Sequence, residues 1–365
     1  MSEQIAGDAK ELGVPGSRPP LSARRVGPGR PFSGLARATA PHVLASALAL
    51  ALAIVLAAGL AVPKSARAAA KAGESEPAAT FPSGFEADPA YKAFDEGNYL
   101  KALELAKAQA EAGEAAACTL IGRINAEGLG VRQDFSEAAV WYKKGAERGD
   151  ANAMLALGLL LVAGEGVKRD EVAAAQLFRL ASERGNVLAG YNLALLYLKD
   201  GDVKGSPDAA FALIERAAKA SYAPAEYDLG TLYAAGHGVA KDEAKAAFWT
   251  GRAAEAGLSD ARVDYALMLF NGRGVPKDQA RAAYFFSAAA EEGNPVAQNR
   301  LARFYAFGIV FDKDLVMATK WHLLARAAGV SDLQLDVLMS TLSPEDRRSA
   351  DSQAGAWLDR RSGLE

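Results

Sequence analysis

One histidine lies between two glycines in the segment YAAGHGVAKD, residues 233–242. A histidine in a loop can act as a general base, and a glycine-rich loop can bind phosphate through its backbone amides. His237, flanked by Gly236 and Gly238, is therefore the first candidate for chemistry in this sequence. Its interpretation depends on whether the loop occurs once, as an active site would, or recurs along the chain.

Other side chains suited to catalysis or metal binding are few. The chain has one cysteine, Cys118, and three histidines, His42, His237 and His322. A single cysteine excludes an intramolecular disulfide, and so few thiol and imidazole groups disfavour a zinc site. No Ser/His/Asp or Cys/His arrangement is suggested, and no spacing singles out a pair of carboxylates for acid–base catalysis. We interpret Cys118 as a small residue near the core and His322 as a half-buried helix residue, and we predict no catalytic residue, no metal site and no cofactor.

Charge is unevenly distributed along the chain. Residues 1–68 contain eight Lys or Arg and three Asp or Glu, so the remainder has 33 basic and 41 acidic residues, a net charge of −8. A protein that neutralises a nucleic-acid backbone carries the opposite sign. We therefore expect no nucleic-acid partner.

Three N-terminal segments precede the first helical pattern. Residues 1–42 are rich in Pro, Gly and Arg and lack apolar periodicity, which predicts a disordered basic n-region. Residues 43–62 are an uncharged apolar run, and the A-x-A sequence Ala66-Arg67-Ala68 fits a signal-peptidase site. We therefore interpret residues 43–68 as a signal peptide with its cleavage site or as a single membrane anchor. Residues 69–87, with Gly, Pro, Ser and Glu, have the composition of a linker.

Arginines upstream of the apolar run predict its orientation. Positive residues stay on the cytoplasmic side of a membrane, so the rest of the chain is expected to be exported. The mostly alanine run favours cleavage over anchoring, and in either case membrane contact is confined to this segment. Arg24-Arg25 resembles a twin-arginine signal only weakly, and the long n-region leaves open a later translation start at Val26. The expected location is the periplasm, with the repeat domain either free or anchored to the inner membrane.

Beyond residue 113 the chain repeats every 36 residues in six blocks, which together cover residues 114–329. A fixed period of this length indicates a solenoid, in which each repeat packs against its neighbours. Alanine occupies the fourth and twenty-fifth positions of every block, which implies close contact between two helices. The fourth-position alanines are Ala117, Ala153, Ala189, Ala225, Ala261 and Ala297; those at the twenty-fifth are Ala138, Ala174, Ala210, Ala246, Ala282 and Ala318.

Helix boundaries recur at fixed positions in the blocks. Glycine at position 15 of five blocks can take the left-handed conformation that ends a helix. Aspartate at position 21 of five blocks, with serine in the third, can cap the N-terminus of a second helix. The position-15 glycines are Gly128, Gly164, Gly236, Gly272 and Gly308, and the predicted caps are Asp134, Asp170, Ser206, Asp242, Asp278 and Asp314.

These residues match the Sel1-like repeat, a relative of the tetratricopeptide repeat. Block four, AEYDLGTLYAAGHGVAKDEAKAAFWTGRAAEAG, fits the Sel1 pattern almost letter for letter. Block three departs from it, because KDGDVKGSPDAA lacks both loop glycines, and block six has Val310 in place of the second glycine. The resemblance implies an all-α fold, an α-solenoid or superhelix of stacked helix–turn–helix repeats, preceded here by the signal or anchor segment. We expect a different loop in block three.

Both ends of the repeat array need an element that covers their apolar surface. Residues 88–113 resemble a degenerate N-terminal cap repeat, and residues 330–365 carry two helix-start signals that predict C-terminal capping helices.

The recurrence of the loop also answers the question raised by His237. Five other side chains occupy its position in the other blocks, which predicts an exposed loop residue rather than a base; they are Leu129, Glu165, Gly201, Arg273 and Ile309.

The resemblance further implies that the first helix of each repeat lines a concave surface where a protein or peptide binds. Tyr191 and Tyr227 hold the same position in neighbouring blocks and offer apolar area with a polar tip. Arginine can bind a carboxylate with two hydrogen bonds. We predict that the partner contacts Arg123, Tyr191, Asn192, Tyr227, Asp228, Asp264, Asn299, Arg300 and Arg303.

The leading hypothesis is a non-catalytic, exported scaffold or adaptor that mediates protein–protein interaction in the bacterial cell envelope. Alternatives are a periplasmic negative regulator of a membrane sensor, as some Sel1-like proteins are, and an envelope hydrolase of the β-lactamase-like Sel1 type. The Sel1-like proteins linked to β-lactam binding carry paired cysteines in every repeat, and this chain lacks those pairs. The enzymatic analogy therefore does not transfer.

Overall fold

The computed structural model describes residues 88–199 and 201–362, and all of their regular structure is helical. Two helices precede the first block: α3 (Pro89–Asp95) and α4 (Tyr99–Glu111). The first helices of the six blocks, which we name A helices, are α5 (Ala115–Glu127), α7 (Ala151–Ala163), α9 (Val187–Leu198), α11 (Ala223–Ala235), α13 (Ser259–Asn271) and α15 (Pro295–Phe307). The second helices, or B helices, are α6 (Phe135–Glu147), α8 (Glu171–Glu183), α10 (Pro207–Lys219), α12 (Glu243–Glu255), α14 (Gln279–Glu291) and α16 (Leu315–Ala327). Two more helices follow: α17 (Leu333–Ser340) and α18 (Pro344–Ser362).

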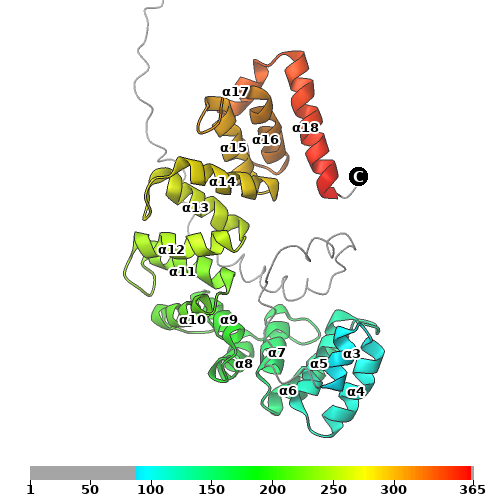
Figure 1. The fold of residues 1–365 in the computed structure, drawn as a ribbon. Helices are drawn as coiled ribbons and strands as arrows, with labels where there is room; N and C mark the ends of the chain where they lie inside the picture. Colours follow the sequence, from blue (N-terminus) through cyan, green and yellow to red (C-terminus); the bar gives the residue numbers. More distant parts are fainter. Residues whose placement is uncertain (1–87, 200, 363–365) are drawn as a thin grey trace, which may run out of the picture. The chain divides into compact units, whose positions relative to one another are not determined.

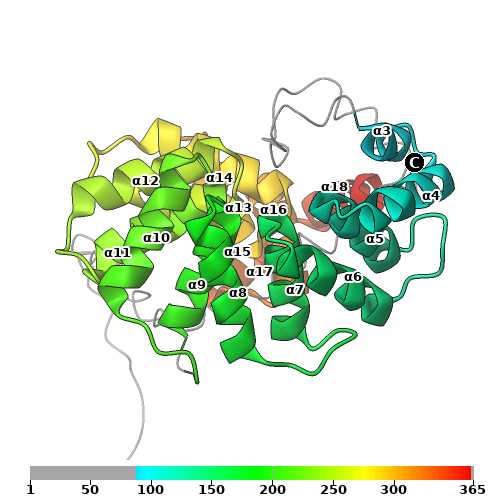
Figure 2. The ribbon, with the colours of Figure 1, turned by 90° about the horizontal axis from the view of Figure 1, so that it is seen from below.

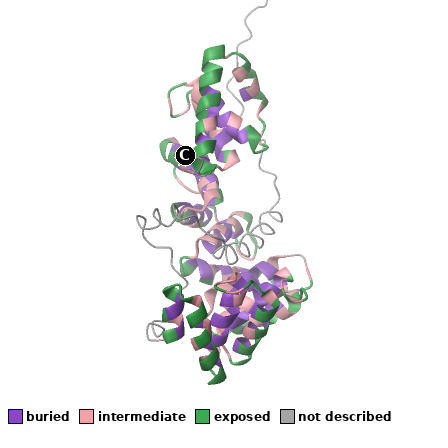
Figure 3. Cartoon of the chain, turned by 90° about the vertical axis from the view of Figure 1, so that its right-hand side faces the viewer, coloured by how far each residue is buried: buried purple, intermediate pink, exposed green. Residues whose placement is uncertain are grey.

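Within the six blocks, each helix packs mainly against its neighbours in sequence. Every A helix contacts the B helix of its own block, and the B helices of the first five blocks contact the A helix of the next block, as Figures 1 and 2 show. Buried residues lie where helices face each other, while the outer sides are exposed (Figure 3). This serial packing confirms the prediction of an all-α solenoid.

Small residues permit the close approach of the two helices in each repeat. All twelve alanines of the fourth and twenty-fifth positions are buried. In repeat two, a Cβ added to Gly158 of the A helix would lie 2.5 Å from Cε1 of Phe178 on the B helix. Such a contact is far below the van der Waals distance, so the Phe178 ring occupies the space that any side chain at position 158 would need.

The predicted helix ends form as expected. Gly128, Gly164, Gly236, Gly272 and Gly308 end their helices in the left-handed conformation, with φ between 65° and 76°. The six predicted N-caps each accept a hydrogen bond from a backbone amide of the B helix that follows. Repeat three differs, as predicted: α9 ends at Leu198, and Lys199 after it has φ −76° and ψ 136°, an extended conformation without the left-handed turn.

Repeat six keeps the loop of the other repeats despite losing its second glycine. Val310 takes φ +68°, close to the +67° of Gly166 and the +69° of Gly238 at the same position. For a β-branched residue this conformation is strained, because Cβ crowds the neighbouring carbonyl oxygens.

We expect Val310→Gly to raise the free energy of unfolding by about 1 kcal/mol, because it removes this strain from an exposed loop. Urea unfolding followed by circular dichroism measures the change. Val296→Gly is the control, since Val296 is also exposed but lies inside α15, where glycine destabilises a helix. A loss of stability in Val310→Gly would contradict the expectation.

Within residues 88–199 and 201–362 we find no helix whose length and apolar character would let it cross a membrane. The predicted n-region, signal or anchor segment and linker, residues 1–87, lie outside the described residues.

Candidate protein-interaction surface

Two tyrosine–aspartate hydrogen bonds join the A helices of repeats three, four and five. The Tyr191 hydroxyl on α9 donates to Oδ2 of Asp228 on α11 at 2.8 Å. The Tyr227 hydroxyl, also on α11, donates to Oδ2 of Asp264 on α13 at 2.7 Å. Both pairs are separated by 37 residues, one repeat plus one position, so each tyrosine reaches the next A helix. We name these two bonds the Tyr–Asp ladder.

The first bond of the ladder is buried. Tyr191 is 1% exposed and Asp228 is 2% exposed. Burial raises the pKa of Asp228 to about 6, although the hydrogen bond from Tyr191 opposes this by stabilising the carboxylate. Burial, together with the Asp228 charge, also raises the pKa of Tyr191 far above its ordinary value. Tyr191 therefore keeps its proton and donates it to the ionised carboxylate of Asp228.

The burial of these residues corrects the predicted binding groove. Tyr191, Asn192 and Asp228 are buried, so they cannot reach an external partner in this structure. Asn192 donates its side-chain amide to the Leu188 carbonyl of its own helix at 2.8 Å. Tyr227 and Asp264 are half-buried and bonded to each other. The two tyrosine–aspartate hydrogen bonds link consecutive repeats, because a tyrosine on one A helix is long enough to reach the aspartate on the next A helix.

The predicted residues of repeat six face a segment of the same chain. Arg303 donates from Nη1 to Oδ2 of Asp332 at 2.7 Å and from Nη2 to Gln334 at 2.8 Å. Asn299 donates to the same Asp332 oxygen at 3.4 Å. Arg300 is half-buried, and burial lowers the pKa of its guanidinium. The structure thus places α17, rather than an open groove, beside Asn299 and Arg303.

Arg123, the remaining predicted contact, lies in repeat one. Its Nε bonds Glu127 at 2.8 Å, and its guanidinium carbon lies 4.7 Å from the centre of the Phe94 ring on α3. Arg123 therefore helps to attach α3 to the first A helix.

His237, His322 and Cys118 occupy three different environments, while His42 lies outside the described residues. His237 is exposed in its loop, as predicted. His322 is fully buried rather than half-buried, since α17 covers it and Asp336 Oδ1 lies 3.0 Å from its Nε2. Cys118 is buried, 3.1 Å from Nη1 of Arg148. Among the described residues, no three His, Cys, Asp or Glu side chains gather closely enough to hold a metal ion.

Two aromatic side chains on the B helices are more exposed than any predicted contact residue. Phe248 on α12 is 58% exposed and Tyr284 on α14 is 68% exposed. They hold the same position in neighbouring repeats, and each packs edge-on against the next aromatic residue, Trp249 or Phe285, with ring centres 5.1 and 5.3 Å apart. We name Phe248 and Tyr284 the outer aromatic pair. The sequence contained this signal, because only these two repeats have an aromatic residue at this position; the others have Val140, Gln176, Ala212 and Lys320.

Helix pairs that repeat along the chain, each packed mainly on its neighbours, define an α-solenoid repeat protein. The sequence profile of the Sel1 repeat matches six consecutive stretches: 115–150, 151–186, 188–222, 223–258, 259–294 and 295–330. The chain therefore belongs to the Sel1 repeat family, whose repeats generally mediate protein–protein interaction.

Solved structures support the same assignment. The crystal structure of c5321, a protective antigen present in uropathogenic Escherichia coli strains, is 27% identical with a TM-score of 0.65. That match covers 74% of this chain and 62% of c5321, so the chain spans less than two thirds of that protein. A Sel1 repeat protein from Oxalobacter formigenes is also 27% identical, with a TM-score of 0.59 and coverage of 67% of this chain and 97% of that one. A search of curated proteins found no match.

Proposed function

We propose that this protein is an exported scaffold or adaptor that binds another protein in the bacterial cell envelope. The Sel1 repeat array supports a role in protein binding. Export is supported by the uncharged run 43–62, the A-x-A sequence at 66–68 and the arginines that precede the run.

The observation that carries the binding role is the outer aromatic pair. Large aromatic side chains that are more than half exposed are costly in water and are enriched at protein interfaces. Phe248 and Tyr284 recur at one position of successive B helices, so a partner lying across repeats four and five could contact both. The Trp249 and Phe285 rings behind them hold the two side chains in place.

We expect the double variant Phe248→Ala, Tyr284→Ala to capture its envelope partner at least about tenfold less efficiently than the parent protein, because it removes two aromatic contacts. The measurement is quantitative mass spectrometry after affinity capture from envelope extract. Gln176→Ala is the control, since Gln176 is exposed at the same position of repeat two.

Two outcomes would contradict the proposal. The first is unchanged capture by the double variant with an unchanged circular dichroism spectrum. The second is turnover of a cell-wall or β-lactam substrate by the purified protein, lost on a single substitution. Export is tested separately by fractionation and by sequencing the N-terminus of the mature protein, and a chain found only in the cytosol would contradict it.

A further inference from the structure

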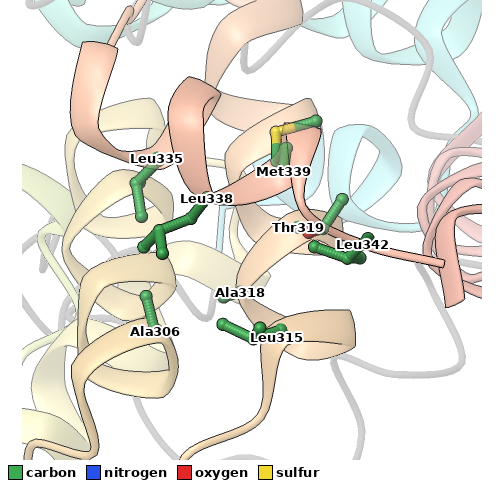
Figure 4. Close-up of a pocket in the computed structure, with 8 residues that line it drawn as sticks. All are labelled: Ala306, Leu315, Ala318, Thr319, Leu335, Leu338, Met339 and Leu342. Atoms are coloured by element: carbon green, nitrogen blue, oxygen red, sulfur yellow. The ribbon is translucent and has the colours of Figure 1, made fainter. Parts of the chain in front are cut away.

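Helix α17 is weakly packed for an element that covers the end of a repeat array. Of its eight residues only Leu335 is buried, while Leu333 and Val337 are 78% and 58% exposed. Beneath it lies a cavity of about 10 Å³, lined by Ala306 of α15, by Leu315, Ala318 and Thr319 of α16, and by Leu335, Leu338, Met339 and Leu342 (Figure 4). A cavity of this size holds one water molecule at most, so it reflects imperfect packing.

Apolar and polar contacts together attach α17 to repeat six, since Leu335 and Leu338 pack against its core and two carboxylates of α17 bond to its side chains. Asp332 at its N-terminus accepts from Arg303 and Asn299 of α15. Asp336, one turn later, faces His322 at 3.0 Å and Arg326 at 3.1 Å, both on α16. The repeat therefore presents two sets of donors to two carboxylates spaced one helical turn apart.

The donor set comes from repeat six itself, because Asn299 and Arg303 lie on α15 and His322 and Arg326 lie on α16. The His322 side chain is fully buried beneath α17, with Nε2 3.0 Å from Oδ1 of Asp336. If α17 left, these side chains would face water and could bind the carboxylates of another helix through charge-assisted hydrogen bonds. The surface of repeat six that α17 covers, which we name the groove, therefore favours an acidic helix with apolar residues on one face.

Besides the hydrogen bond from Arg347 to the Met339 carbonyl of α17, helix α18 has contacts of its own with α14 and α16. The Trp357 indole donates to Glu291 at 2.8 Å, and its ring centre lies 6.3 Å from that of Trp321 on α16. Residues 328–343 can therefore leave the groove as a loop, while α16 and α18 remain packed together.

We propose that α17 is an internal ligand of a helix-binding groove on repeat six, which accepts an acidic amphipathic helix of a partner protein when α17 is displaced. The groove is distinct from the outer aromatic pair on repeats four and five. Charge complementarity defines the helix that the groove accepts. This helix carries two carboxylates one turn apart, and Leu or Met residues lie on the adjoining face of the same helix.

The test uses a fluorescent peptide of residues 331–343 and the full-length protein. An opened variant, Leu335→Ala with Asp336→Asn, lacks the buried leucine and one carboxylate of α17. We expect it to bind the peptide at least tenfold more tightly than the parent protein, as measured by fluorescence anisotropy. Adding Arg303→Ala should weaken this binding at least tenfold, whereas adding Arg348→Ala, an exposed arginine on α18, should not change it.

Hydrogen exchange on the unaltered protein gives a second readout. Backbone amides of α17 should exchange at least a hundredfold faster than those of α16 and α18. Equal protection of the three helices would overturn the proposal, as would absence of peptide binding to an opened variant that remains folded. Light scattering could instead show that the opened variant forms a dimer that the peptide dissociates. A second copy of this chain would then occupy the groove, and the proposal of a different partner protein would be wrong. Phe248→Ala with Tyr284→Ala should leave peptide binding unchanged, which separates this groove from the proposed envelope interaction.

Discussion

The Asp228→Asn variant is expected to be more stable than the parent protein by up to about 3 kcal/mol at pH values above about 7. Asp228 is buried, and burial raises its pKa to about 6. Between its ordinary pKa of 3.8 and this value, the folded state binds a proton that the unfolded state has released. The parent protein therefore loses stability as the pH rises through this interval, and the loss is complete above it. Asparagine has no charge to bury and keeps an oxygen that accepts from Tyr191.

The measurement is urea unfolding at a series of pH values from about 4 to about 8. The difference between the two proteins should be near zero at the acidic end and should grow towards neutral pH. Asp351→Asn is the control, because Asp351 is exposed on α18 and its removal changes the net charge equally. If the difference in free energy of unfolding between the variant and the parent protein does not depend on pH, the ionisation of Asp228 is not its cause.

Gly274→Ala is expected to lower the free energy of unfolding by about 3 kcal/mol, from two causes. Gly274 has φ +69°, a conformation that disfavours any side chain. A Cβ at this position would also overlap the carbonyl group of Glu243, where α12 begins. The overlap is with backbone, so no rotation of a side chain can relieve it, and the loop must move away from the preceding repeat.

Gly149→Ala separates the two causes. Gly149 has φ +91°, yet a Cβ there would meet nothing within 4 Å. We expect it to lower stability by only about 1 kcal/mol, the conformational cost alone. Thermal unfolding of both variants, compared with the parent protein, measures the two losses. Equal losses would mean that the contact between loop and preceding helix contributes nothing.

The repeat architecture could be predicted because it depends on backbone requirements that repeat in the sequence. Asp242 caps a helix and Gly236 ends one through local geometry, so each is recognisable without knowing its distant neighbours. Recurrence also identified His237 correctly as an exposed loop residue. Domain boundaries at 88–113 and 330–365 remain predictions, as do the segments before residue 88.

The candidate site was harder to predict. Helical spacing indicates on which side of a helix a residue lies, but it does not indicate which other element covers that side. Tyr191 and Asp228 lie on the predicted side of their helices, yet they bond each other across a repeat boundary. The separation of 37 residues, shared with Tyr227 and Asp264, was a usable signal in the sequence. His322 is buried by α17, which lies outside the repeat pattern, so no periodic argument could place it.

The Tyr–Asp ladder has a consequence for how this chain unfolds. In a linear array, unfolding can stop at any boundary between repeats, and it stops most readily where the boundary is weakest. Hydrogen bonds between side chains cross the boundaries from repeat three to four and from four to five. Side-chain hydrogen bonds cross other boundaries as well, such as Thr119 to Asp150 and Asn186 to Asn152, but the Tyr191–Asp228 bond differs from these in being buried. Separating repeats three to five would break both bonds of the ladder, so we expect these three repeats to unfold together. The outer aromatic pair lies on repeats four and five, so the surface proposed to bind a partner belongs to this unit.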